Sequence, residues 1–176
     1  MLKLTPPDPD FYIFGDGASS QKQDAGAWCG LIMRAEDRAI KILMGSEYPT
    51  TISRMELMPI ISSVRWLTRY WKGYHVCPTV RIYSDSEYTI KTISGVYPRK
   101  KNLELWVAVD EALKGINPDF VWRQRNTLPQ TVLVDTVCTV LRKRLKNYII
   151  ECFDDFKEPE KSIGSLSLPD QEEMND

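Results

Sequence analysis

The sequence has few of the residues that build zinc fingers, disulfide scaffolds or membrane spans. Among 176 residues there is one histidine, His75, and the four cysteines are widely spaced with no C-x-x-C pair. This excludes the usual structural zinc motifs and indicates free thiols in a reducing compartment. No apolar run approaches membrane-spanning length, and residues 1–10 lack the apolar core of a signal peptide. We therefore expect a soluble, cytoplasmic protein without a membrane partner, and take a monomer as its simplest state.

The chain also lacks a strong overall charge. Its 23 basic and 24 acidic residues give a net charge of -1, which neither favours nor excludes a polyanionic partner. The distribution is uneven, because residues 157–176 hold six acids against two lysines and leave the remainder mildly basic. This acidic segment is predicted to be a disordered tail. It either keeps the chain solvated or serves as a docking peptide for a replication partner.

Hydrophobic residues make up 43% of the sequence, which is enough for the core of one domain. We place this domain at residues 11–156, after an extended, proline-rich lead-in at residues 1–10. Apolar patterning predicts strands at 11–14, 27–33, 39–44, 79–84 and 120–122, and helices at 54–71, 86–93, 102–113 and 132–150. The order β-β-β-α-β-α-α-β-α indicates an α/β fold with a five-stranded mixed sheet and helices packed on it.

The first long helix carries two signals that disagree. Ser53 is followed by Glu56 three residues later, which is the spacing of a capping box at a helix start. Pro59 lies within the same apolar periodicity, although a proline inside a helix lacks an N–H donor and crowds the carbonyl group four residues earlier. We expect either a kink at Pro59 or a regular helix that begins late.

Two aspartates are predicted to follow strands. Asp16 comes just after the strand at 11–14 and stands between two glycines, while Asp85 directly follows the strand at 79–84. Taken alone, Asp16 is better explained as a residue of a sharp glycine turn. If the two strands lie side by side and parallel, because a helix connects them, both aspartates fall at the same edge of the sheet.

Two further acids are predicted at helix starts, Glu56 in the first long helix and Asp135 in the last. Each alone is explained by the favourable interaction of an acid with the positive end of a helix. Four converging carboxylates would repel one another, so such a cluster normally holds hard divalent cations. Two ions roughly 3.5–4 Å apart can activate a water and stabilise the leaving oxygen of a phosphodiester. The joint pattern favours such a metal site.

Four segments resemble the successive motifs of type 1 ribonuclease H, in that family's order: FGDGAS at 14–19, SRMELM at 53–58, YSDSEY at 83–88 and NLELW at 102–106. The resemblance covers residues 11 to about 145. It implies the ribonuclease H-like fold, two Mg²⁺ or Mn²⁺ ions, and endonucleolytic cleavage of the RNA strand of an RNA–DNA hybrid. By motif position, the catalytic D-E-D-D metal ligands would be Asp16, Glu56, Asp85 and Asp135.

Three features depart from the pattern of that family. Arg125 stands ten residues before Asp135, where the family usually carries a mobile histidine. The pKa of an arginine is too high for a proton shuttle, so Arg125 would either hold a phosphate or be a solvated loop residue. The loop at 19–26 lacks the asparagine and most of the glycines of relatives, and Glu87 adds negative charge. These departures leave two alternatives open, a non-catalytic module that binds nucleic acid or protein, and a nuclease acting on DNA.

A protein that follows a nucleic-acid backbone needs lysines and arginines beside its active site. The expected contacts are Arg54, Ser86, Lys101, Arg123 and Arg125. The basic run at 142–146 is either a further contact or a solvated helix face. Four tryptophans on apolar stripes are expected in the core rather than as base-stacking platforms, namely Trp28, Trp66, Trp106 and Trp122.

Overall fold

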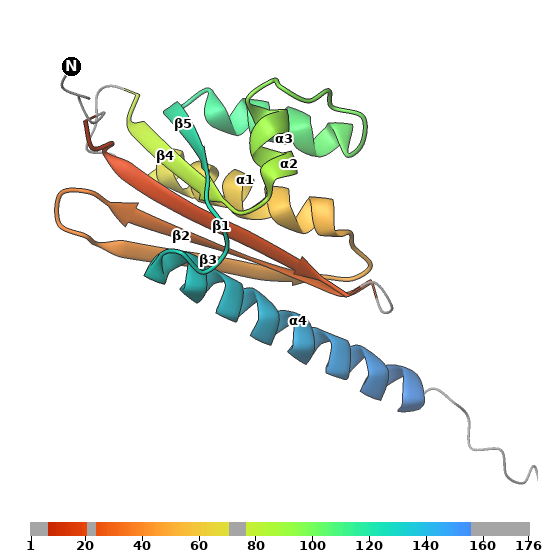
Figure 1. Ribbon diagram of the computed structural model, residues 1–176. Helices are drawn as coiled ribbons and strands as arrows, with labels where there is room; N and C mark the ends of the chain where they lie inside the picture. Colours follow the sequence, from red (N-terminus) through yellow and green to blue (C-terminus); the bar gives the residue numbers. More distant parts are fainter. Residues whose placement is uncertain (1–6, 21–23, 71–76, 156–176) are drawn as a thin grey trace, which may run out of the picture.

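The computed structural model describes residues 7–20, 24–70 and 77–155, with residues 148–155 as helical backbone alone. Most of the expected lead-in and the whole acidic segment at 157–176 lie outside the described residues. Within them the predicted order of strands and helices is confirmed (Figure 1). The elements are β1 (Phe11–Ser19), β2 (Gly26–Arg34), β3 (Ile40–Glu47), α1 (Ile52–Tyr70), β4 (Thr79–Ser84), α2 (Glu87–Ile93), α3 (Leu103–Leu113), β5 (Asn117–Trp122) and α4 (Pro129–Asp155).

The five strands form one mixed sheet in the order β3-β2-β1-β4-β5. The meander β1-β2-β3 is antiparallel, whereas β4 pairs with β1 and with β5 in parallel. Parallel neighbours need a crossover, and α1 supplies it between the meander and β4. In Figure 1, α1 lies on one side of the sheet and α4 crosses the other. The predicted α/β fold with a five-stranded mixed sheet is thus confirmed.

Successive residues of β1 point to opposite faces of the sheet and fill two separate cores. Phe11 and Ile13 pack with apolar residues of α1 and α3, while Tyr12 and Phe14 pack with residues of β2 and α4. Asp16 is the next residue of β1 on the face that carries Tyr12 and Phe14, so it lies at the end of the second core. The strand therefore carries an acid at the end of an apolar row.

The segment Gly15-Asp16-Gly17 continues β1 and makes no turn, so the turn interpretation of Asp16 is wrong. Asp16 pairs with Cys29 of β2 within a ladder that extends to Ser19. Gly17 is needed for close approach, because a Cβ atom there would lie 2.4 Å from the carbonyl carbon of Met55 in α1. Helix α1 therefore rests directly on the backbone of β1.

Helix α1 begins earlier than expected and continues through Pro59 without a break. The amide of Arg54 donates to the hydroxyl of Thr51 at 3.4 Å, so Thr51 rather than Ser53 caps the helix. The predicted capping box is wrong, and Glu56 lies in the second turn. A late start is also wrong, since Ile52 is the first helical residue.

Helix α4 also begins before its predicted start, and its first residue is Pro129, whose fixed φ suits the first helical position. Asp135 therefore lies in the second turn rather than the first. Interactions with the helix macrodipole are confined to the terminal turn. Favourable charge at a helix start consequently explains neither Asp135 nor Glu56.

The four tryptophans do not share the environment predicted for them. Trp106 is 2% exposed and lies in the core as expected, whereas Trp28 and Trp66 are half-buried. Trp122 is 48% exposed, so its assignment to the core is wrong. It ends β5, an edge strand of the sheet that also tolerates a proline at position 118. In the part of the chain that the structure describes, no helix has the length and apolar character to cross a membrane.

Candidate functional site

Three carboxylates meet at one edge of the sheet. Parallel pairing of β1 with β4 ends at Phe14 opposite Tyr83, and both strands run on past that point. Asp16 and Asp85 each lie two residues beyond this last pair, while Glu56 approaches from α1. Each acid offers an oxygen within 4.8 Å of the other two. The predicted convergence of these three residues is therefore present in the structure.

The two innermost acids are buried, and each has a carboxylate oxygen without a hydrogen-bond partner. Asp16 is 4% exposed and Glu56 9% exposed. Both carboxylate oxygens of Asp16 and Oε2 of Glu56 accept no hydrogen bond in the structure. Buried carboxylate oxygens without donors are rare unless a cation neutralises them. Oxygen ligands in a three-carboxylate cluster fit a hard divalent cation such as Mg²⁺ or Mn²⁺.

Burial also shifts the acid–base equilibrium of these groups. Loss of solvation, followed by the charge of Asp85, raises the pKa of Asp16 to about 7. Loss of solvation and the charge of Asp16 raise the pKa of Glu56 to about 8. Arg125 opposes both shifts. Near neutral pH the site therefore accepts positive charge readily, whether as protons or as a metal ion.

These shifts predict how stability depends on pH when divalent cations are removed. The pKa values in the folded protein lie above their ordinary values of 3.8 and 4.5, so the folded state binds more protons. The resulting stabilisation is complete below about pH 4 and is lost as the pH rises to about 8. Replacing Asp16→Asn is expected to stabilise the metal-free protein at pH 8 by about 4 kcal/mol, since the pKa of Asp16 is raised from 3.8 to about 7 and one pKa unit corresponds to about 1.4 kcal/mol. Urea unfolding in EDTA at pH 5 and pH 8 measures both effects.

Asp119→Asn is the matched control, because Asp119 is an exposed acid paired with Arg81 on β4 at 2.7 Å. This variant is expected to show the same decline between pH 5 and pH 8 as the wild type. A metal-free Asp16→Asn protein with an unchanged pH profile would contradict the assignment of the decline to the carboxylate cluster.

Arg125 lies among the acids, in the turn between β5 and α4. Its Nε donates to Oδ2 of Asp85 at 2.6 Å, and its Nη2 lies 3.6 Å from Oδ1 of Asp16. Its Nη1 lies 3.5 Å from Oδ1 of Asp135. The residue that stands in place of the family's histidine thus contacts three of the four predicted ligands. The interpretation of Arg125 as a merely solvated loop residue is wrong.

Asp135 lies beside the triad rather than within it. It is half-buried on α4 and lines a cavity of about 10 Å³ together with Asp16, Asp85 and Arg125. Its place in a ligand set remains a prediction.

Sequence reasoning missed two contacts that hold the acids in place. The thiol of Cys138 on α4 donates to the backbone carbonyl oxygen of Asp16 at 3.2 Å. The indole Nε1 of Trp122 donates to the backbone carbonyl oxygen of Asp85 at 3.0 Å. In each contact the donor and the acceptor are far apart in sequence, and no local pattern predicts the pair. Of the two donors, Trp122 is the one whose contact the sequence could have suggested, because Trp122 ends an edge strand and therefore lies close to the loop that carries Asp85.

The remaining predicted nucleic-acid contacts have different surroundings. Arg54 is held by Glu47 of β3, with Nε 2.7 Å from Oε2. The hydroxyl of Ser86 accepts from the amide of Thr89 at 3.3 Å and caps α2. Lys101 is exposed before α3, and the guanidinium of Arg123 lies 6.0 Å from the ring centre of Tyr83. Arg54 and Ser86 thus make contacts within the protein. Contact of any of these residues with nucleic acid remains a prediction.

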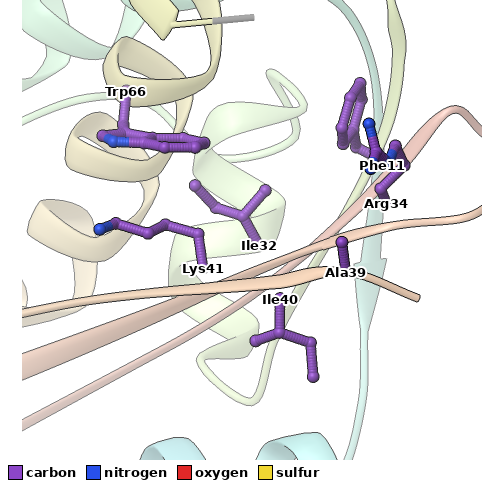
Figure 2. A pocket seen from close by; sticks show the side chains of 7 residues that line it. All are labelled: Phe11, Ile32, Arg34, Ala39, Ile40, Lys41 and Trp66. Carbon is purple, nitrogen blue, oxygen red and sulfur yellow. The ribbon is translucent and has the colours of Figure 1, made fainter. Parts of the chain in front are cut away.

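A second pocket lies on the α1 side of the sheet, between α1 and the turn that joins β2 to β3. It has a volume of about 110 Å³, and Figure 2 shows Phe11, Ile32 and Trp66 among the side chains that line it. The ammonium group of Lys41 lies 5.6 Å from the ring centre of Trp66. Its lining contains no carboxylate, histidine or cysteine. The carboxylate cluster is therefore the better candidate for chemistry.

Comparison with solved structures shows the same fold. The N-terminal RNase H domain of a Mycobacterium tuberculosis protein, solved as a fusion with maltose-binding protein, superposes with a TM-score of 0.70 at 14% identity. The alignment covers 81% of this chain and 99% of that one. LC11-RNase H1, solved in complex with an RNA/DNA hybrid, gives a TM-score of 0.67 at 16% identity and covers 77% and 98% of the two chains.

Comparison of sequences identifies the family. The RNase H family profile matches residues 8–134. The ribonuclease H of Cupriavidus metallidurans is 37% identical over 115 residues, which cover 58% of this chain and 73% of that protein. The ribonuclease H of a Bradyrhizobium species is 35% identical over 127 residues, covering 65% and 77%. Fold, acids and relatives together define the class of the protein, a ribonuclease H-type endonuclease. The chain belongs to the ribonuclease H family.

Proposed function

We propose that the chain hydrolyses the RNA strand of RNA–DNA hybrids with two divalent cations, Mg²⁺ or Mn²⁺, and leaves 5′-phosphate and 3′-hydroxyl ends. The observation that carries this proposal is the triad of Asp16, Glu56 and Asp85, in which both carboxylate oxygens of Asp16 and Oε2 of Glu56 are buried without a hydrogen-bond donor. The complex of LC11-RNase H1 with an RNA/DNA hybrid supports the choice of substrate. We further propose that the protein acts as a monomer and that it works in the cytoplasm, a location that the free buried thiols of Cys29 and Cys138 support.

Each acid has a distinct role in this proposal. Asp16, Glu56 and Asp85 would hold one ion, Asp16 and Asp135 would hold the other, and Glu56 would also help to place the substrate. When bound, the ions activate a water molecule and stabilise the leaving oxygen of the phosphodiester. The chain holds the acids ready for this: Cys138 fixes the backbone of Asp16 through its carbonyl oxygen, and burial of Asp16 and Glu56 excludes bulk water from their carboxylates.

A panel of labelled substrates tests the proposal directly. RNA–DNA hybrid, duplex DNA, duplex RNA and branched DNA would each be incubated with Mg²⁺, with Mn²⁺ and with EDTA. We expect cleavage of the RNA strand of the hybrid alone, and only with a divalent cation. Cleavage of a DNA substrate in place of the hybrid would replace this proposal with a DNA-directed nuclease of the same fold.

One observation favours a second candidate, a non-catalytic module that binds nucleic acid or protein. Arg125 already neutralises part of the charge of three acids, so the cluster has a partner without any metal. Calorimetric titration with Mn²⁺ separates the two candidates. A module that only binds needs no divalent cation, and the absence of Mn²⁺ binding together with the absence of hybrid cleavage would favour it.

Removal of residues 157–176 tests the role proposed for the acidic tail. A tail that only keeps the chain solvated can be deleted without effect, and we expect hybrid cleavage to stay within about twofold of the full-length rate. Steady-state cleavage of a labelled hybrid by the two proteins measures this. A large loss of activity in the truncated protein would show that the tail takes part in folding or in substrate binding.

A further inference from the structure

The guanidinium group of Arg125 occupies the place of a cation shared by several carboxylates. Its three nitrogens are directed to three different acids, Asp85 at 2.6 Å, Asp135 at 3.5 Å and Asp16 at 3.6 Å. These acids come from three elements that are remote in sequence. A planar guanidinium can join several carboxylates in this way, whereas an ammonium group acts as a point charge.

We infer that Arg125 is a built-in cation that competes with the second divalent ion for Asp16 and Asp135. Consequently, the chain binds one ion readily at Asp16, Glu56 and Asp85, and a second ion much more weakly. This inference rests on the proposed function and deepens it, because it assigns unequal affinities to the two ion positions. It also gives a role to the residue in which this chain departs from its family.

Space and charge both support competition at one side of the cluster. The cavity that Asp16, Asp85, Arg125 and Asp135 line with three other residues measures about 10 Å³, which is about the minimum for one water molecule. An ion that binds Asp135 must therefore displace the guanidinium or accept its positive charge at contact distance. Two positive charges at contact distance repel each other strongly, even when solvent partly screens them.

On the Glu56 side of the cluster, the competition is confined to Oδ2 of Asp85, which accepts from Nε of Arg125 at 2.6 Å. Arg125 forms no ion pair with Glu56 in the described structure, and Oε2 of Glu56 has no hydrogen-bond partner. Asp16 also retains Oδ2, which accepts no hydrogen bond. The first ion can thus bind between Glu56 and Asp16 while the guanidinium keeps its contact with Asp135.

Arg125 is placed so that it can leave without disturbing the core. Its side chain is 53% exposed, and it lies in the turn between β5 and α4 rather than in either element. The next residue, Asn126, adopts a positive φ of 61°. Movement of the guanidinium towards solvent breaks ion pairs alone, so the competition with a metal ion is reversible.

Binding of Mn²⁺ to the full-length protein, measured by calorimetry and by the electron paramagnetic resonance of free Mn²⁺, tests the inference without nucleic acid. Wild type is expected to bind one ion and then a second at least about tenfold more weakly. Arg125→Gln is expected to strengthen the second binding about tenfold and to leave the first little changed. Arg123→Gln is the matched control, because Arg123 lies in the same loop as Arg125 but its guanidinium lies over the ring of Tyr83. This control is expected to bind both ions as the wild type does.

Addition of millimolar guanidinium ion to Arg125→Gln is expected to weaken the second binding again, whereas urea, which has the same shape without the charge, is not. Arg125→Met serves the same purpose if the glutamine variant does not fold. Equal second-site affinities in wild type and in these variants would overturn the inference, and cleavage of the hybrid would show that the proposed function still stands. Failure of every variant to bind Mn²⁺, together with no cleavage, would overturn both.

Discussion

Cleavage of the RNA strand of a hybrid is expected to be on the order of a thousandfold slower for Asp16→Asn than for wild type, and similarly slow for Asp85→Asn. Each substitution removes a negative charge from the triad while it keeps the size of the side chain. Stabilisation of transition-state charge by a metal ion contributes several kcal/mol, and each 1.4 kcal/mol corresponds to about a tenfold change in rate. Initial rates with a labelled hybrid at saturating Mg²⁺ measure the loss.

Asp119→Asn is the control for this experiment, because it makes the same chemical change at an exposed ion pair with Arg81. Its rate is expected to equal that of wild type. Asp16→Asn is also expected to be at least as stable as wild type without metal, so a slow rate cannot be attributed to unfolding. Equal rates for wild type, Asp16→Asn and Asp85→Asn would exclude the proposed mechanism.

The order of helices and strands, and the convergence of the three acids of the triad, could be predicted from the sequence because both depend on local patterns. The strand at 79–84 was predicted with its observed limits, since an apolar run there is bounded by Pro78 and Asp85. A helix between two strands implies parallel pairing, and this pairing places Asp16 and Asp85 at one edge. The approach of Glu56 followed from its position on the crossover helix.

The boundaries that were wrong depend on contacts that no local pattern reveals. Gly17 looked like a turn residue, yet it is small because the backbone of Met55 lies against it. Pro59 lies inside α1 where the helix meets the sheet, and a Cβ atom on Gly15 of β1 would lie 3.2 Å from Cβ and Cγ of its ring. Packing between a helix and a strand thus accounts for Gly17, which sequence patterns interpreted as a turn residue, whereas the kink expected at Pro59 stays a prediction.

The position of the Arg125 side chain among the carboxylates could not be predicted from sequence patterns either. The resemblance to the family showed that an arginine replaces a histidine, but its contact with Asp85 spans 40 residues. Only the arrangement of β4 beside β5 brings the turn before α4 to the carboxylates. The substitution therefore changes the charge at the centre of the site rather than at its rim.

Gly17→Ala is expected to destabilise the protein by about 3 kcal/mol and to reduce hybrid cleavage as well. The added Cβ would lie 2.4 Å from the carbonyl carbon of Met55, 2.5 Å from its oxygen and 2.6 Å from the amide nitrogen of Glu56. Backbone atoms of a helix cannot rotate away from a clash, so α1 must move away from β1. That movement takes Glu56 away from Asp16 and opens the triad. Urea unfolding and the rate of hybrid cleavage, measured on the same preparation, test both consequences.

Gly15→Ala is the matched comparison, since Gly15 lies two residues earlier on the same face of β1. Its added Cβ would lie 3.2 Å from Cβ and Cγ of Pro59, which are side-chain atoms that can shift by a few tenths of an ångström. We expect a loss of about 1 kcal/mol and nearly normal cleavage, because the backbone of α1 beside Glu56 need not move. If the two variants were equally stable and equally active, close packing of α1 on Gly17 would not be what positions Glu56. A graded loss places the control of the active site in the backbone contact between Gly17 of β1 and Met55 of α1, each of which is the chain neighbour of an acid of the triad.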